Sequence, residues 1–178
     1  MKSIRHIGIC GLGQMGAAAA VSFKRAGYQV MAWNHRPERL EALPGITATL
    51  EAWMDQHMGP APDPSGTLQT HDDLRVLDEQ VDVVLDCIAE DMAVKVDLFN
   101  QFPASKDRSA LFLTTTSGLS ITETGRLSGC ANLIAGTHFW NPPHLMPLVE
   151  VVRGQDTPDT VIDQVCELVK SIGKTPCA

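Results

Sequence analysis

The sequence has 178 residues, with 21 acidic and 14 basic side chains and a formal net charge of −7. This length is enough for one domain with a buried core. No lysine and arginine cluster is long enough for a nucleic-acid surface, and no apolar run reaches the ~18 residues of a membrane span, so we expect neither partner. The five cysteines are odd in number and form no CxxC pair, which indicates reduced thiols and a cytoplasmic protein.

Apolar stretches alternate with amphipathic ones, which is the pattern of repeated β-α units around a parallel sheet. The expected elements in chain order are a strand over 4–10, a helix over 14–26, a strand over 29–33, helices over 36–43 and 50–58, a strand over 67–70, a helix capped near Asp72, a strand over 81–88, a helix over 91–102, a strand over 110–114, a helix over 121–127, strands over 133–137 and 148–152, and a helix from Thr157-Pro158 to Gly173. Residues 59–66 hold three prolines and two glycines, so we interpret them as a surface loop within one domain, 1–178.

The segment Gly11-Leu12-Gly13-Gln14-Met15-Gly16 follows the first apolar strand and opens an alanine-rich helix. In that context the first glycine permits a tight turn, the second lets the backbone approach a pyrophosphate, and the third allows close contact between helix and strand. The helix N-terminus adds free N–H groups for the phosphates. The motif therefore predicts a dinucleotide site on a Rossmann-type, doubly wound, mostly parallel α/β sheet. A glycine-rich turn without a ligand is the alternative.

The second expected strand ends at Asn34, with His35 and Arg36 next. An acid at this point bonds the adenosine ribose and repels a 2′-phosphate, whereas asparagine bonds a hydroxyl without repelling phosphate. Arg36 has the chemistry to pair with a phosphate, and it is equally explained as a solvated cation at a helix start. We expect NAD as cofactor, with NADP left open.

The segment from His138 to Glu150 presents an imidazole, a stiff Asn-Pro-Pro turn at Asn141, and a carboxylate twelve residues on. Oxidation of an alcohol needs a base that titrates near neutrality, and histidine does so ordinarily. If the loop returns to a neighbouring strand, Glu150 orients His138, while Ser117 and Asn141 donate to the substrate oxygen. A metal site formed by His138, His144 and Glu150 is an alternative whose spacing matches no helix-borne zinc motif, so we predict no metal.

Four segments resemble the N-terminal NAD-binding domain of the 3-hydroxyacyl-CoA dehydrogenase family, including its carnitine and gulonate dehydrogenase relatives. They are 11–16, 86–91 with Lys95, 114–119 and 138–150. The resemblance implies that His138 is the catalytic base, that Glu150 orients it, and that Ser117 and Asn141 contact the substrate oxygen and the nicotinamide side.

The resemblance also implies a cofactor subsite. It places Glu90 and Lys95, with Ala89 beside them, along the nicotinamide half of the site. Thr115 stands where the family usually has asparagine, and Asn34 stands where it usually has aspartate.

The same resemblance implies a second, helical domain that closes the substrate cleft and forms a dimer, and we expect it to lie outside this chain. The predicted function is hydride transfer between NAD(P) and a 3-hydroxyacyl-CoA or a smaller 3-hydroxy acid. No lysine occurs between Lys24 and Lys95, which favours the smaller acid over a CoA diphosphate. The alternative is a nucleotide-binding module without turnover of its own.

Overall fold

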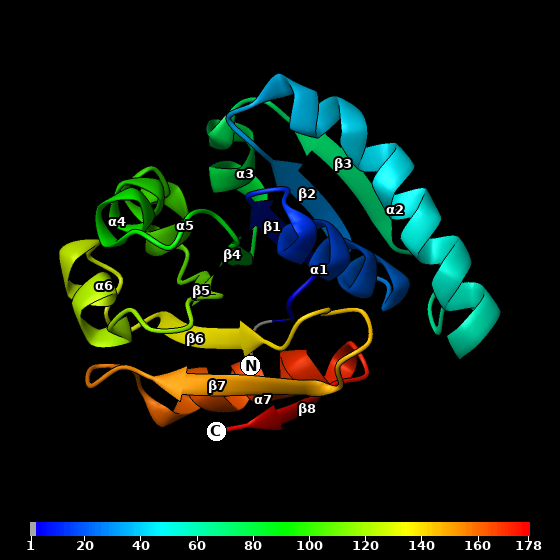
Figure 1. Cartoon of the computed structure of the whole chain (residues 1–178). Helices are drawn as coiled ribbons and strands as arrows, with labels where there is room; N and C mark the ends of the chain where they lie inside the picture. Colours follow the sequence, from blue (N-terminus) through cyan, green and yellow to red (C-terminus); the bar gives the residue numbers. More distant parts are fainter. Residues whose placement is uncertain (1–2) are drawn as a thin grey trace.

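One eight-stranded sheet organises the computed structural model, which describes residues 3–178 (Figure 1). Its strands are β1 (His6–Cys10), β2 (Gln29–Trp33), β3 (Thr67–His71), β4 (Val83–Asp86), β5 (Leu111–Thr114), β6 (Ile134–Phe139), β7 (Leu148–Arg153) and β8 (Thr175–Cys177). The strand order is β3-β2-β1-β4-β5-β6-β7-β8. Every neighbouring pair is parallel except β6 and β7, which run antiparallel.

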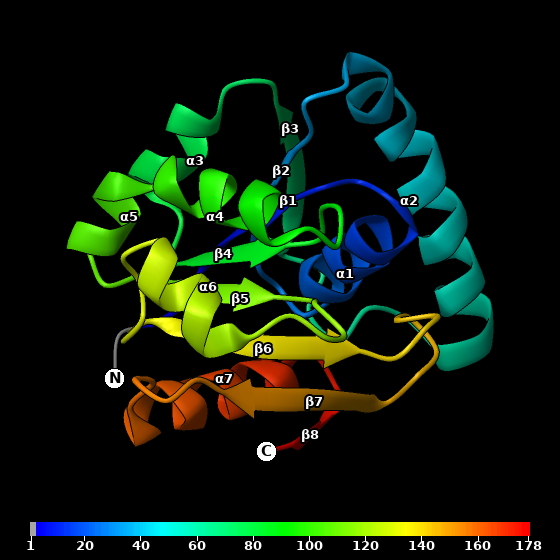
Figure 2. The same ribbon diagram turned by 60° about the vertical axis from the view of Figure 1, so that its left-hand side comes forward.

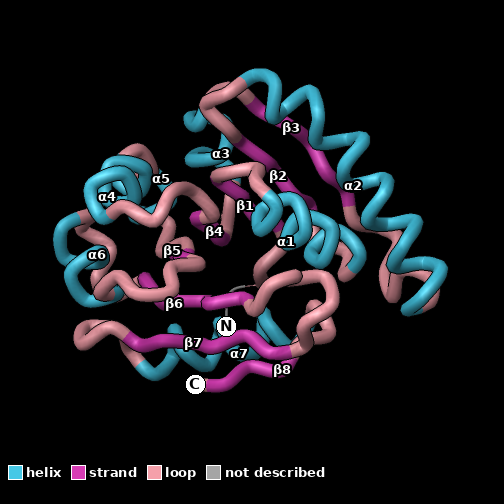
Figure 3. The backbone as a smooth tube through the Cα atoms, in the orientation of Figure 1, coloured by secondary structure: helices cyan, strands magenta, loops and turns pink. Residues whose placement is uncertain are grey.

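Helices cover both faces of this sheet (Figures 2 and 3). They are α1 (Gln14–Arg25), α2 (Pro37–Met58), α3 (Leu74–Gln80), α4 (Met92–Asn100), α5 (Pro103–Asp107), α6 (Ile121–Leu127) and α7 (Asp159–Ser171). Buried residues of α1 and α7 share one apolar core, to which α2 adds Leu43, and residues of α3, α4 and α6 share the other. Among the described residues, no helix combines the length and apolar character of a membrane span.

Alternate side chains of the central strands contribute to two different apolar cores, one on each face of the sheet. Leu111 and Leu113 of β5 face the α1 and α7 side, and Phe112 between them faces the α4 side. Successive side chains of a strand point to opposite faces, so a strand buried on both sides reads as a continuous apolar run. The predicted doubly wound, mostly parallel α/β architecture is confirmed.

The expected elements are all present, with ends that differ by a few residues, and the 59–66 segment is the predicted loop. The short helix α5 was not expected. The prediction of two helices over 36–43 and 50–58 is wrong, because α2 runs unbroken for 22 residues through Pro44 and Gly45. Buried Leu43, Thr47 and Met54 lie on one side of it, so packing holds it together despite the local sequence.

Replacement of Pro44 by alanine tests whether α2 is continuous. Proline inside a helix removes one backbone hydrogen bond and crowds the preceding turn, at a cost of about 3 kcal/mol. Pro44 is exposed, so Pro44→Ala loses little packing and is expected to raise the free energy of unfolding by about 1–3 kcal/mol in urea denaturation. A decrease, or no change, would mean that the chain bends at Pro44 instead of continuing as a helix.

Candidate active site

The carboxyl ends of β1, β4, β5 and β6 meet at one edge of the sheet because these strands are parallel. The chain winds from β1 toward β3 in one direction and from β4 toward β6 in the other, so the winding reverses between β1 and β4. Ligands of open α/β sheets bind at such a reversal. The segments that follow these four strands contain most of the predicted site residues.

The glycine turn after β1 is shaped by contacts with its neighbours. Gly11 has φ of +99°, and a Cβ there would lie 2.5 Å from the Cys87 carbonyl oxygen. A Cβ on Gly16 would lie 1.8 Å from the Gly11 oxygen, so both positions require glycine. Gly13 is exposed and nothing lies within 4 Å of its Cβ position. Space is therefore open at the position where a pyrophosphate is expected.

A cavity of about 180 Å³ opens beside this turn. It is lined by Gly11, Leu12, Gly13, Asn34, His35, Arg36, Arg39, Cys87, Ile88 and Ala89. Leu12 is itself buried and offers mainly its backbone, while Gln14 and Met15 form the first turn of α1. The structure thus brings the predicted phosphate and ribose residues together, and this cradle fits a dinucleotide.

Two thiols lie beside the cradle, and both have a raised pKa. Burial, followed by the negative charge of Asp86, raises the pKa of both Cys10 and Cys87 above the ordinary value. Both cysteines therefore stay protonated near neutral pH. The prediction of a core position in a strand is confirmed for Cys10, whereas Cys87 follows the end of β4, is partly exposed and lines the cavity.

The most buried charges of the site are Asp86 at the end of β4 and Lys95 on α4. Their side chains are 0% and 1% exposed, and Lys95 Nζ donates to Asp86 Oδ2 at 2.8 Å. Thr114 Oγ1 donates to the same oxygen at 2.7 Å, and the Ile88 amide donates to the other at 2.9 Å. A buried carboxylate is stable only with partners of this kind. The lysine predicted to line the cofactor is thus held inside the fold by Asp86.

Glu90 connects this buried pair to the loop after β5. Its Oε1 accepts from Thr116 Oγ1 at 2.5 Å, from the Ser117 amide at 2.9 Å, and from Ser117 Oγ and the Gly118 amide at 3.3 Å each. Its Oε2 lies 3.7 Å from Lys95 Nζ. Burial alone raises the pKa of Glu90, but these hydrogen bonds and the lysine charge outweigh it and lower the pKa. Glu90 therefore remains a carboxylate that fixes Ser117.

The antiparallel turn from β6 to β7 places His138 opposite Glu150 in the strand register. His138 Nδ1 and Glu150 Oε2 are 2.8 Å apart, and the two side chains are 31% and 42% exposed. Within residues 3–178 the other ring nitrogen, Nε2, forms no hydrogen bond. Nδ1–H donation to the carboxylate leaves Nε2 as a proton acceptor facing outward from the pair.

The loop 140–147 between these strands carries Asn141, which is exposed. Buried Lys174 anchors the loop, since its Nζ donates to the carbonyl oxygens of Pro143 at 2.5 Å and Met146 at 2.8 Å. His144 lies edge-on to Trp53 of α2, with ring centroids 5.8 Å apart. Figures 1 and 2 show this loop rising toward the carboxyl end of α2. Within the described residues, no group of three His, Cys, Asp or Glu side chains is arranged to hold a metal.

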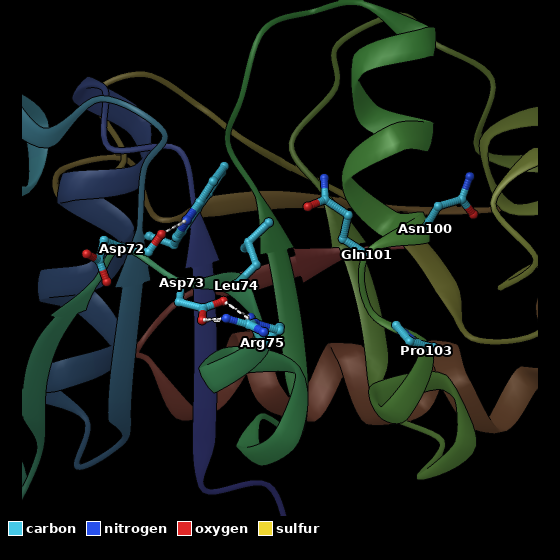
Figure 4. A pocket seen from close by; sticks show the side chains of 8 residues that line it. Asp72, Asp73, Leu74, Arg75, Asn100, Gln101 and Pro103 are labelled. Atoms are coloured by element: carbon cyan, nitrogen blue, oxygen red, sulfur yellow. Dashed lines mark hydrogen bonds and ion pairs between the residues drawn. The ribbon is translucent and has the colours of Figure 1, made fainter.

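A larger hollow of about 760 Å³ lies elsewhere, beside the starts of α3 and α5 (Figure 4). Two of its polar contacts are internal to the chain: Asp73 pairs with Arg75 at 2.7 Å, and Trp33 Nε1 donates to the Asp72 carbonyl at 3.2 Å. None of the predicted catalytic residues lines it. We therefore do not assign this hollow as the active site, although it is larger than the cavity beside the glycine turn.

The structure assembles the predicted residues as three groups along one edge: the glycine cradle with residues 34–36 and Ala89, the Glu90–Ser117 group, and the His138–Glu150 pair. No hydrogen bond in the described chain joins Ser117 or Asn141 directly to His138, and the Thr115 amide is engaged by the Asp86 carbonyl at 3.1 Å. Sequence reasoning missed Asp86, Thr116 and Lys174, and it considered Arg39 only as a candidate cation for a CoA diphosphate. Only Asp86 gave a signal, as a charge that ends an apolar strand.

Two glycine replacements separate ligand binding from folding. Gly13→Val is expected to fold normally, because its side chain enters open space, but to abolish NADH binding in a fluorescence titration by occupying the pyrophosphate position. Gly16→Val is expected to unfold the protein by circular dichroism, because its Cβ overlaps the Gly11 oxygen. Tight NADH binding by folded Gly13→Val would disprove the assignment of the cradle.

Removal of the buried ammonium tests the role of the Asp86–Lys95 pair in stability. Lys95→Met leaves Asp86 buried without its cation, which costs about 3–5 kcal/mol. The matched control is Lys170→Met, which breaks the exposed Lys170–Glu167 pair and is expected to cost under about 1 kcal/mol. Urea denaturation of both variants measures the difference, and equal losses would contradict the assigned role.

Comparison with known proteins identifies the family. Residues 6–178 match the family described as "3-hydroxyacyl-CoA dehydrogenase, NAD binding domain". The chain is 29% identical over 174 residues to 5-formyl-3-hydroxy-2-methylpyridine 4-carboxylate 5-dehydrogenase of Mesorhizobium japonicum, covering 97% of this chain and 56% of that protein. It is 33% identical over 180 residues to 3-hydroxyadipyl-CoA dehydrogenase of Escherichia coli, covering 99% of this chain and 38% of that protein.

The fold comparison agrees. A crystal structure of 5-formyl-3-hydroxy-2-methylpyridine 4-carboxylic acid 5-dehydrogenase, named as an NAD⁺-dependent dismutase, superposes with a TM-score of 0.92 and 28% identity, over 98% of this chain and 57% of that one. The chain thus spans only part of these relatives, between 38% and 57% of their length. The glycine cradle, the strand order and the sequence match together place this protein in the family of NAD-binding domains of 3-hydroxyacyl-CoA dehydrogenases.

Proposed function

We propose that this protein is the cofactor-binding and acid–base half of an NAD(P)-dependent dehydrogenase acting on a 3-hydroxyacyl-CoA or a related 3-hydroxy acid. The observation that carries the proposal is the 2.8 Å contact between His138 Nδ1 and Glu150 Oε2, with Nε2 unengaged among the described residues. A protein that only binds a nucleotide has no use for such a pair. This distinguishes the proposal from a binding module without turnover.

Each side chain has a defined task in this scheme. His138 Nε2 removes the proton from the substrate hydroxyl, and the Glu150 carboxylate stabilises the imidazolium that forms. Ser117, fixed by Glu90, and Asn141, on the loop anchored by Lys174, donate hydrogen bonds to the oxygen as it becomes a carbonyl. The nicotinamide cofactor, when bound in the glycine cradle, supplies the hydride acceptor.

Efficient turnover needs a further structural element that covers this edge of the sheet, which we call the second wall of the site. His138 and Glu150 are about one-third exposed or more, whereas hydride transfer requires reacting atoms held about 3–3.5 Å apart away from water. We propose that a helical domain, or a partner subunit, supplies that wall, as the greater length of the relatives supports. The unpaired cysteines support a cytoplasmic location.

Replacement of the acid–base pair tests the proposed chemistry. In a fusion with the part of the Escherichia coli relative that this chain does not match, His138→Ala is expected to lower kcat by roughly 10²–10⁴-fold, because the general base is lost. Glu150→Gln is expected to cost less, because the imidazole remains and loses only its orienting charge. Nicotinamide absorbance with panels of 3-hydroxyacyl-CoA and short 3-hydroxy acids measures both.

The control for these variants is His6→Ala, since His6 begins β1 at the opposite edge of the sheet. It is expected to leave kcat unchanged. A fully active His138→Ala enzyme would refute the mechanism, whereas a fully active 178-residue chain would refute the need for a second wall.

A further inference from the structure

The cavity at the start of α2 is basic. Its lining includes His35, Arg36 and Arg39, and none of its lining residues is acidic. This is unusual in a protein with a net charge of −7. The cavity is continuous with the glycine turn, since Gly11 and Gly13 line it as well. The adenosine end of a dinucleotide held by that turn therefore meets positive charge.

Asn34 presents a donor to this cavity. Its Oδ1 accepts from the Arg36 amide at 2.9 Å in an Asx turn, so the carbonyl side of the amide is engaged by the chain itself. The Nδ2 group remains as the free part of the side chain, and it only donates. An aspartate in the same turn would instead present a second charged acceptor. A donor fits the oxygens of a phosphate, which only accept at full ionisation.

No carboxylate of the described residues balances the charges of the two arginines in the cavity, and Arg36 Nε donates to His35 Nε2 at 3.3 Å. Within the described residues neither forms an ion pair with a carboxylate, although four other arginines do. Those four pairs are Arg25–Asp55, Arg75–Asp73, Arg126–Asp156 and Arg153–Asp159. Arg36 precedes α2 and Arg39 lies in its first turn, where the helix dipole disfavours a cation. Guanidinium groups in such surroundings are suited to a dianionic ligand.

We propose that this cavity binds the 2′-phosphate of NADP(H), held by the guanidinium groups of Arg36 and Arg39 and by Asn34 Nδ2. The inference rests on the proposed function, because it takes the glycine cradle as the dinucleotide site. It goes further by assigning Arg39 a role and by making this chain accept the phosphorylated cofactor at least as well as NAD(H). NADH uses the same cradle without engaging the two arginines.

The test compares ligands that differ only in the 2′-phosphate. Calorimetric titration of the 178-residue protein with 2′,5′-ADP and 5′-AMP is expected to give about tenfold tighter binding of 2′,5′-ADP, equivalent to one good charge-assisted contact. That preference is expected to shrink as salt increases. Fluorescence titration with NADPH and NADH extends the comparison to the whole cofactor.

Three variants test which residues cause the preference for the 2′-phosphate. Arg36→Gln with Arg39→Gln is expected to remove the advantage of 2′,5′-ADP and to weaken 5′-AMP much less than 2′,5′-ADP. Asn34→Asp retains the Asx turn and is expected to weaken NADPH binding about tenfold or more without weakening NADH, because a carboxylate repels the phosphate. Arg75→Gln is the matched control, since this exposed arginine lines the neighbouring hollow of Figure 4, outside the cavity, and should change neither affinity.

The outcomes separate this inference from the proposed function. If NADH binds but 5′-AMP binds as tightly as 2′,5′-ADP, or the arginine variant weakens both ligands equally, the phosphate site is refuted and the dinucleotide site stands. If the folded protein binds neither NADH nor NADPH, both ideas fail. A preference for 2′,5′-ADP that depends on Arg36 and Arg39 supports the inference.

Discussion

The buried carboxylate of Asp86 is the interaction on which the site depends. It ends β4 beside the reversal of strand winding, and it gathers Lys95 from α4, Thr114 from the end of β5 and the amide of Ile88. Two charges in a dry interior are stable only when such partners surround them. The pair therefore fixes the distance between the loop after β4 and the loop after β5. Glu90 extends this order outward, because it touches Lys95 on one side and Ser117 on the other.

The change from parallel to antiparallel strands at β6 and β7 has a chemical consequence. A parallel neighbour would need a long crossover, whereas a short loop brings β7 back beside β6 in the opposite direction. Residues in register then face one another, which is how a carboxylate twelve positions further along the chain reaches His138. The pair is built on two strands instead of a mobile loop, so its geometry is held by backbone hydrogen bonds.

Much of this fold follows from local sequence. The glycine turn, the strand ends and the Asp73, Asp91 and Ser120 caps are encoded by nearby residues, and the His138–Glu150 pair follows from a motif with a specific spacing. The continuous α2 does not, because tertiary packing overrides the local effect of Pro44. The Asp86–Lys95 pair, the Glu90 contacts and the hydrogen bonds from Lys174 to the loop 140–147 join residues that are separated in sequence. Periodicity carries no information about such contacts, so sequence reasoning identified Lys95 without its partner and missed Lys174.

The 22 residues of α2 connect the two ends of the site. At 1.5 Å per residue this helix is about 33 Å long, enough to span a small domain. It begins at the basic cavity with Arg36 and Arg39, and Trp53 in its last turns packs against His144 on the loop that carries Asn141. The unexpected continuity of the helix through Pro44 therefore matters for the site. One helix carries the two arginines that line the basic cavity and also contacts the loop that carries Asn141. A break in the middle of α2 would therefore uncouple the position of the cavity from the position of that loop.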